Sequence, residues 1–336
     1  MRNFVIAFSV FLAFVFIMAL AIGQGDESVT DLGYADDLEQ VDNFLSTEEE
    51  YIEPEIAEPE VQIEVAEESE PEPETEPVNT AHLFDNSAIE IPKATVVFPE
   101  QILVREGYTT SYNKETKCAN WVAWKLTKEH TYGDYHRSGV PYYDENYKVI
   151  GIGKVNENVV RNSYIVDKEA GPPRQEFSDW YDAPANTDHG HICPAADNKW
   201  SKAAINQSFL LTNMCPQDHD LNGGDWATLE DRCRGWARRY GEIYIAAGPV
   251  FFNGITKTMG ANKVGVPDAF YKVVLYLGKS PKALGFIFPN NGTHHRLEEY
   301  LLSVDEVEQV TGFDFFHNLP DDVENIIEAQ SDLKLW

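Results

Sequence analysis

Three apolar runs in the second half of the chain have the length expected of β-strands. They occupy 242–252 (EIYIAAGPVFF), 271–277 (YKVVLYL) and 283–289 (ALGFIFP), and turn-forming residues bound each of them. The pattern at 225–240 is instead helical, because apolar residues recur there every three or four positions along one face. The residues of this face are Trp226, Leu229, Cys233, Trp236, Ala237 and Tyr240.

A second helix is predicted to begin just after Ser303, since Ser303 and Glu306 have the spacing of a capping box. Gly312 is a natural stop for that helix. Strands and helices therefore occur together without regular alternation, and no repeat accompanies them apart from a Glu-Pro tract near the start of the chain. This arrangement predicts the α+β class.

The first 23 residues form an apolar segment of their own. The run from Phe4 to Ile22 has Ser9 as its only polar residue and follows Arg2, which is typical of an export signal. Small residues before Gln24 favour cleavage near Gly23. The run is also long enough to span a bilayer, so an uncleaved membrane anchor remains the alternative.

Residues 24–92 contain 23 Asp and Glu and no Lys or Arg, and they include the tract EPEPETEP. Charge repulsion and low hydrophobicity predict a disordered, acidic, Glu/Pro-rich linker. A sharper hypothesis is that the linker competes with an anionic substrate for a basic cleft. Removing these 23 acids from the total of 56, and Arg2 from the 26 bases, leaves 33 acids and 25 bases. The folded domain expected at 93–336 is therefore only mildly acidic.

All four cysteines fall within the predicted domain, at Cys118, Cys193, Cys215 and Cys233. An even number in an exported chain favours disulfide bonds, although three pairings are possible. Zinc is the competing interpretation, because histidines lie among the cysteines. No CxxC pair is present, however, and structural zinc sites usually contain such pairs. Disulfide bonds are therefore the favoured expectation.

Four polar residues point to phosphodiester chemistry. His191 precedes the turn-prone Cys-Pro-Ala-Ala-Asp segment, and Asn222 lies at the entrance of the predicted helix 225–240. Within that helix, Glu230 and Arg234 are four residues apart and so share a face. A base for water, oxygen ligands for a hard cation and a cationic donor together suit phosphodiester hydrolysis.

The chain resembles the DNA/RNA non-specific endonucleases, the ββα-metal nucleases with a DRGH-type motif. DHGHICPAAD resembles the signature motif, and the resemblance continues through LLTNMCPQDHDLNGGDWATLEDRCR. Upstream WVAWKLT and downstream GPVF, VPDAFYKV and GFDFF extend it over most of 100–318. The resemblance implies a ββα-metal fold, with a central mixed or antiparallel sheet flanked by helices.

The resemblance also implies a role for each matching residue. His191 is expected to be the general base, and Asn222 the direct ligand of a Mg²⁺ ion, with Mn²⁺ as an alternative. Glu230 is expected to hold metal-bound waters, while Arg234 stabilises the charge on the phosphorane. The remaining site residues implied by the resemblance are Asn213 near the phosphate, Asp188 as support and Arg137 as an upstream phosphate clamp.

The motif departs from the family pattern at His189, where the family has arginine. A neutral histidine supplies neither the permanent charge nor the bidentate phosphate donor of a guanidinium. We therefore expect lower activity, or activity that rises at mildly acidic pH if His189 becomes protonated there.

The function expected from these features is an exported, Mg²⁺-dependent endonuclease that cuts DNA and RNA without sequence preference and leaves 5′-phosphate ends. The acidic composition does not exclude this, because a hydrolase needs only a local basic groove. The expected source of that groove is Arg232, Arg234, Arg238 and Arg239. Two alternatives remain, a catalytically weak nucleic-acid-binding surface protein of the same fold and a phosphodiesterase for small nucleotides. No protein partner is expected, and a membrane only if the first segment stays uncleaved.

Overall fold

The computed structural model describes residues 88–137, 142–143, 149–151, 159–160 and 164–336. The predicted export segment and nearly all of the predicted acidic linker lie outside these residues. Ile89, which the sequence assigned to the end of the linker, is fully buried in the hydrophobic core, so the folded part includes residues before 93. No helix among the described residues has both the length and the apolar character needed to span a membrane.

A seven-stranded sheet forms the centre of the fold, and all its neighbouring strands are antiparallel. The apolar runs predicted as strands form three adjacent members of this sheet, which confirms them. In spatial order the strands are β16 (Leu301–Leu302), β15 (Lys282–Pro289), β14 (Ala269–Tyr276), β11 (Glu242–Val250), β4 (Cys118–Thr127), β3 (Thr109–Asn113) and β2 (Gln101–Val104).

Alternate side chains of the central strands face two separate hydrophobic cores. In β11, Ile243 and Ile245 pack in one core, whereas Tyr244 and Ala246 pack in the other. This follows from the two-residue period of a strand, which sends successive side chains to opposite faces. Both faces of the sheet are therefore covered, and for this reason its central strands are almost continuously apolar.

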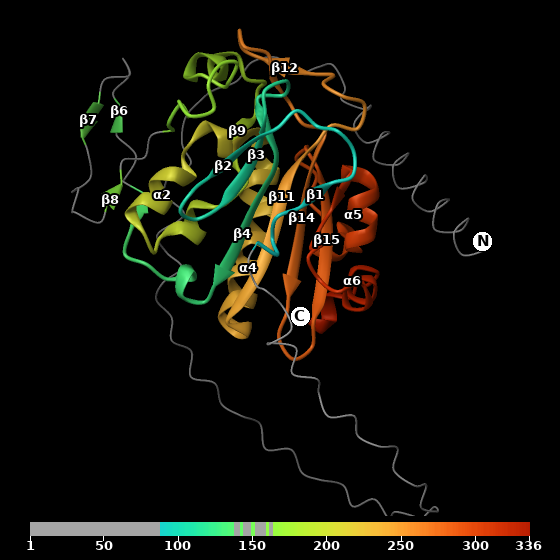
Figure 1. The fold of residues 1–336 in the computed structure, drawn as a ribbon. Helices are drawn as coiled ribbons and strands as arrows, with labels where there is room; N and C mark the ends of the chain where they lie inside the picture. Colours follow the sequence, from blue (N-terminus) through green and yellow to red (C-terminus); the bar gives the residue numbers. More distant parts are fainter. Residues whose placement is uncertain (1–87, 138–141, 144–148, 152–158, 161–163) are drawn as a thin grey trace, which may run out of the picture. The chain divides into compact units, whose positions relative to one another are not determined.

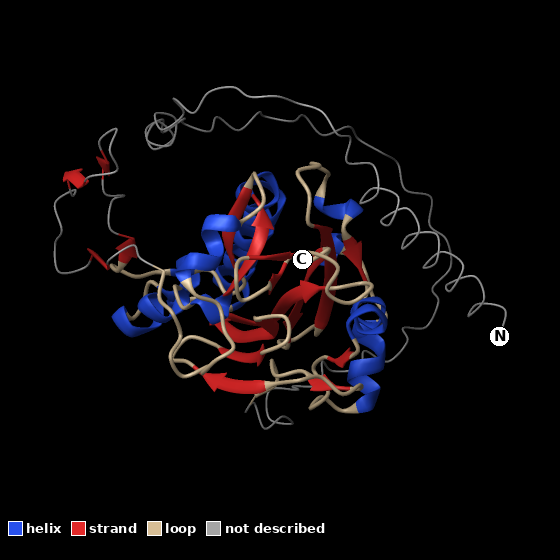
Figure 2. Cartoon of the chain, turned by 90° about the horizontal axis from the view of Figure 1, so that it is seen from above, coloured by secondary structure: helices blue, strands red, loops and turns tan. Residues whose placement is uncertain are grey.

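Helices cover the two faces of the sheet differently (Figure 1). Helix α4 (Ala227–Tyr240) contributes its apolar stripe to the first core, as its periodicity predicted. The short helices α5 (Val304–Thr311) and α6 (Asp321–Glu328) pack on the second core, on the other side of the strands. Figure 2 shows helices on both sides of the strands from a second direction. The α+β class is confirmed, and the central sheet is antiparallel rather than mixed.

The predicted start and stop of α5 are also confirmed. The Ser303 hydroxyl accepts a hydrogen bond from the Glu306 backbone N–H, and the Glu306 carboxylate accepts one from the Ser303 backbone N–H. Gly312 ends the helix with φ at +73°, a left-handed conformation that costs glycine little.

Smaller elements surround the sheet. The two-stranded pairs are β1 (Lys93–Ala94) with β17 (Phe313–Asp314), β5 (His136–Arg137) with β8 (Val159–Val160), β6 (Tyr142–Tyr143) with β7 (Val149–Gly151), β9 (Thr187–His191) with β10 (Met214–Asp218), and β12 (Thr258–Met259) with β13 (Val264–Gly265). The remaining helices are α2 (Lys202–Ser208), α3 (His219–Leu221) and a π-helical turn at Asn222–Trp226. The 3₁₀ turns are Glu129–Thr131, Phe177–Asp182, Ala195–Asn198, Leu211–Asn213, Leu297–Glu299 and Leu333–Leu335.

Candidate active site

The candidate site is built on strands β9 and β10 and the start of α4, a β-β-α arrangement. The strands pair antiparallel, with His191 opposite Met214 and Gly190 opposite Cys215. Gly190 is required by close packing, because a Cβ atom there would lie 2.3 Å from the Gln217 side-chain oxygen. The tight pairing fixes Asp188 and His191 relative to the chain that leads into α4.

Asp188 links β9 to the residues just after β10. Its Oδ2 atom accepts a hydrogen bond of 2.8 Å from the Asn222 side-chain amide and lies 2.9 Å from His219 Nδ1. Since the amide nitrogen of Asn222 is engaged, its carbonyl oxygen is the atom left to face a ligand. Asp188 therefore contacts Asn222 directly, and its supporting role in catalysis stays a prediction.

Asn222 sits at the start of the π-helical turn that precedes α4, as its sequence position predicted. The turn is kinked at Gly224, whose φ and ψ are −104° and −106°. A Cβ atom at this position would lie 2.5 Å from Cε1 of the exposed His294 ring, so a side chain here would require that ring to move. The glycine thus allows the chain to break helical geometry between Asn222 and α4.

Glu230 and Arg234 both belong to α4, and the charge of each acts on the other. Glu230 is partly buried, and burial raises the pKa of its carboxyl to about 7, an effect that the nearby Lys272 and Arg234 oppose. Arg234 forms ion pairs with Asp197, at 2.9 Å, and with Asp231. Burial alone would lower the pKa of Arg234, but these carboxylates raise it above its ordinary value. Arg234 therefore remains a fixed positive charge beside Glu230.

Two further charged residues, Asp197 and Lys272, act on Glu230 and were not identified in the sequence analysis. Asp197 is buried and accepts hydrogen bonds from Arg234 and from the Trp124 indole N–H. Lys272 is only 1% exposed, and its Nζ lies 4.0 Å from the centre of the Trp226 ring. A lysine inside the apolar run 271–277 was a visible signal, because an unpaired buried ammonium is costly. Nothing in the sequence alone shows that its charge acts on Glu230.

His191 is the last residue of β9 and is half-buried. Its ring packs edge-on against Phe209, with ring centres 5.2 Å apart, and lies 6.3 Å from the Tyr164 ring. His189 shares this side of the strand, as the two-residue period requires. The aromatic contacts hold the expected general base in one orientation.

His189 lies between two aromatic rings, with Tyr164 at 3.9 Å and Trp180 at 3.7 Å between ring centres, both stacked. Burial lowers the pKa of His189 to about 4, although Asp188 opposes the shift. The ring is therefore neutral at mildly acidic pH. This contradicts the expectation that protonation of His189 could supply the missing positive charge there.

Asn213, which was expected to lie near the phosphate, is held by hydrogen bonds in the interior of the fold. The residue is fully buried, and its amide nitrogen donates to the Cys193 and Ser208 carbonyl oxygens. Its side-chain oxygen accepts from the Cys193 backbone N–H. With these groups engaged, Asn213 holds the chain that follows His191, and its expected role near the phosphate stays a prediction.

Arg137 belongs to the short strand β5, which pairs parallel with β8. Its side chain lies outside the part of the chain that the structure describes. The phosphate-clamping role of Arg137 therefore stays a prediction.

The four cysteines are free and buried, so the expected disulfide bonds are absent from the structure. Cys193 and Cys233 pack within the first core as small apolar side chains, as free cysteines often do. The zinc alternative also fails among the described residues. There, the cluster of three potential ligands that could hold a metal ion contains neither cysteine nor histidine.

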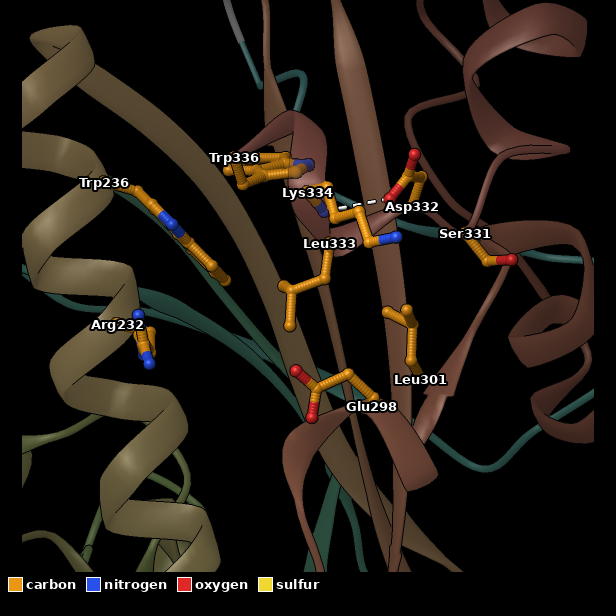
Figure 3. Close-up of a pocket in the computed structure, with 9 residues that line it drawn as sticks. All are labelled: Arg232, Trp236, Glu298, Leu301, Ser331, Asp332, Leu333, Lys334 and Trp336. Carbon is orange, nitrogen blue, oxygen red and sulfur yellow. Dashed lines mark hydrogen bonds between the residues drawn. The ribbon is translucent and has the colours of Figure 1, made fainter.

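The arginines of α4 do not form the single basic cluster expected from the sequence. Arg234 and Arg238 are four residues apart on one face, and Arg238 donates to the Thr131 hydroxyl. Arg239 instead donates to the Trp336 carbonyl oxygen. Arg232 lines a separate cavity of about 330 Å³ between α4 and the C-terminal segment (Figure 3). The other residues lining it are Trp236, Glu298, Leu301, Ser331, Asp332, Leu333, Lys334 and Trp336.

Comparisons with known proteins identify the family and agree with the fold. Residues 85–322 match the family described as DNA/RNA non-specific endonuclease. A nuclease of Nostoc sp. is 30% identical over 242 residues, which are 69% of this chain and 78% of that protein. The mitochondrial nuclease EXOG of Mus musculus is 28% identical over 280 residues, 77% of this chain and 70% of that protein.

A solved structure of an EndoG/EndoGI complex shares the fold. The TM-score is 0.54 at 22% sequence identity, over 67% of this chain and 90% of the other. The chain belongs to the DNA/RNA non-specific endonuclease family, as its motifs indicated. It is a nuclease, a hydrolase that acts on nucleic acids, and the family is metal-dependent.

Proposed function

We propose that the chain is a Mg²⁺-dependent endonuclease that hydrolyses DNA and RNA without sequence preference and leaves 5′-phosphate ends. The observation that carries this proposal is the contact between Asp188 and Asn222 at the entrance of α4. This contact engages the amide nitrogen of Asn222, which leaves its carbonyl oxygen available as a cation ligand. It supports the proposal together with the family membership of the chain.

The donor set fits a hard cation. Asn222 offers a carbonyl oxygen, and the partly buried carboxyl of Glu230 lies on the adjoining helix. Mg²⁺ prefers such oxygen donors and keeps several of its waters, so a single direct protein ligand is sufficient. When bound, the ion supplies positive charge to the scissile phosphate and the leaving 3′ oxygen.

Each of the other side chains has a separate role in the proposed reaction. The His191 imidazole accepts a proton from the attacking water. Glu230, once ionised, accepts hydrogen bonds from waters near Asn222, while Arg234 faces the charge that gathers on the phosphate. Asp188 keeps the Asn222 amide in one orientation.

Recognition through the phosphate backbone gives binding that is sensitive to salt and blind to sequence, which matches a non-specific nuclease. DNA and RNA would then be bound through the same phosphate contacts. The neutral His189 removes one cationic contact, so we propose that the rate is lower than an arginine at this position would give.

The test is to incubate the full chain with supercoiled plasmid and with RNA, in Mg²⁺ or in EDTA. The proposal predicts cleavage of both substrates in Mg²⁺ and none in EDTA. His191→Ala should be inactive, while His317→Ala, a half-buried histidine before α6, should retain activity. Equal activity of the two variants would refute the proposed base. Cleavage of a dinucleotide but not of plasmid would favour a small-nucleotide phosphodiesterase.

Export is proposed from the sequence of residues 1–23, with cleavage before Gln24. Mass analysis of the protein found outside the cell tests this. A mature chain that begins at Gln24 supports cleavage, whereas an intact Met1 in the membrane fraction would identify the segment as an anchor.

A further inference from the structure

Three carboxylates meet between helices α5 and α6, on the face of the sheet opposite α4 (Figure 1). They belong to Asp305 and Glu308, which are three residues apart on one side of α5, and to Glu328 at the end of α6. One carboxylate oxygen from each residue lies within 4.8 Å of the other two. The cluster thus joins two helices that are separate in the sequence.

Glu328 is the buried member of the cluster. The residue is only 3% exposed, and its Oε1 atom is buried without a hydrogen-bond partner. A buried carboxylate with an unsatisfied oxygen is costly unless a proton or a cation compensates it. Glu328 therefore differs from an ordinary solvated acid, because it needs a proton or a cation to compensate it.

The surroundings of Glu328 are strongly negative. Besides Glu308 and Asp305, the carboxylates of Glu324 and Asp314 act on it. The Oε1 atom of Glu308 accepts a hydrogen bond from the Phe315 backbone N–H, so one of its two carboxylate oxygens is already engaged.

Little positive charge offsets these acids. Lys93 lies 3.6 Å from Asp314, but its side chain is mostly exposed and the pair lies near solvent. Exposed ion pairs of this kind contribute little. Two means of compensation remain for the three clustered acids, namely protons shared among them or a bound cation.

We propose that Asp305, Glu308 and Glu328 bind a divalent cation of the Ca²⁺ type at a site separate from the nuclease centre. Ca²⁺ takes oxygen ligands at about 2.4 Å, so two oxygens on one ion can be as far apart as about 4.8 Å. The pairwise spacing of the three oxygens stays within that limit. Zinc is disfavoured, because the cluster offers no nitrogen or sulfur ligand.

The ion would join α5 to α6 and hold both against the second core. Val304 and Val307 of α5 and Ile327 of α6 are buried in that core, beside the proposed ligands. Binding to the folded state alone stabilises it by mass action. The expected effect of the cation is therefore on stability, while the nuclease residues lie on the opposite face of the sheet.

The experiment measures thermal unfolding and Ca²⁺ stoichiometry of the full chain after removal of metals with EDTA. With Ca²⁺ at about 100 times its Kd, the melting temperature should rise by about 5 to 10 °C. Glu328→Gln should lose this shift and one equivalent of Ca²⁺ in equilibrium dialysis. The melting-temperature shift and this equivalent of Ca²⁺ should both be retained in Asn222→Ala, which alters the proposed nuclease site. They should also be retained in Glu115→Gln at an exposed position.

Nuclease activity at saturating Mg²⁺ should be unchanged in Glu328→Gln, which separates this proposal from the proposed function. If that variant does not fold, Asp305→Asn at a partly exposed ligand provides the same comparison. The proposal is overturned if Glu328→Gln retains the Ca²⁺ shift. It is also overturned if the wild type shows no shift and its melting temperature responds only to pH, as a proton-sharing cluster would.

Discussion

Replacement of Asp188 by alanine should raise the Mg²⁺ concentration needed for activity more than it lowers the rate at saturating Mg²⁺. The substitution removes the acceptor of the 2.8 Å hydrogen bond from Asn222, and the amide can then rotate. A hydrogen bond to a charged group contributes about 1.5 to 3 kcal/mol. Because the Asp188 side chain is 33% exposed, we take a lower contribution, about 1 to 2 kcal/mol.

This free energy corresponds to a rise of about 5- to 30-fold in the Mg²⁺ concentration that gives half-maximal activity. The assay is the initial rate of plasmid cleavage across a Mg²⁺ series at constant ionic strength. Asp188→Asn, which can still accept the bond from Asn222, should show a smaller rise. The exposed acid Asp182 supplies the matched control, Asp182→Ala. An unchanged Mg²⁺ midpoint in Asp188→Ala would refute the positioning role.

Other substitutions test the surroundings of the site. Because burial raises the pKa of Glu230 to about 7, its carboxyl keeps its proton below that pH, so activity should increase as pH rises through 7. Lys272→Met removes a charge that lowers the pKa of Glu230, and the acid limb of the pH–rate profile should move to higher pH; an unmoved limb would exclude this coupling. His189→Arg should raise kcat/KM at low salt by about tenfold, which is the effect of one charge-assisted hydrogen bond. A kcat/KM equal to or below that of the wild type would show that an arginine between Tyr164 and Trp180 does not contact the phosphate. Asn213→Ala should lower the free energy of unfolding in urea by about 3 kcal/mol, because it unpairs groups around Cys193; a variant of full stability but no activity would instead place Asn213 at the phosphate.

The parts of the architecture that could be predicted from the sequence are those that depend on local patterns. The strands β11, β14 and β15 are apolar runs, and α4 has a continuous apolar stripe. The capping box at Ser303 and the glycine at 312 are equally local signals. Their order in the sheet is not local, since β11 pairs with the distant β4 as well as with β14.

The same contrast between local patterns and long-range contacts applies to the candidate site. The motif located His191, Asn222, Glu230 and Arg234, and the structure places Glu230 and Arg234 in one neighbourhood. Contacts between distant residues could not be predicted, such as the ion pair of Arg234 with Asp197, 37 positions away.

The environment of His189 was missed for a related reason. Its two stacking partners, Tyr164 and Trp180, come from segments with no periodic pattern. The resulting loss of solvent contact, which lowers the pKa of His189, can be seen only once the chain has folded.

The disulfide expectation failed because it used only the number of cysteines and the expected export of the chain. Cys193 and Cys233 fill space in the core beneath α4, where a small apolar side chain is needed. Cysteine count alone does not distinguish this packing role from a covalent one.

The central claim is that His191 and a cation held at Asn222 together perform phosphodiester hydrolysis. The most direct measurement compares the rate of supercoiled plasmid cleavage by the wild type, His191→Ala and Asn222→Ala across a Mg²⁺ series. The account predicts that His191→Ala loses the rate at every Mg²⁺ concentration. Asn222→Ala should require far more Mg²⁺ for any activity. Wild-type rates in both variants, or cleavage by the wild type in EDTA, would contradict it.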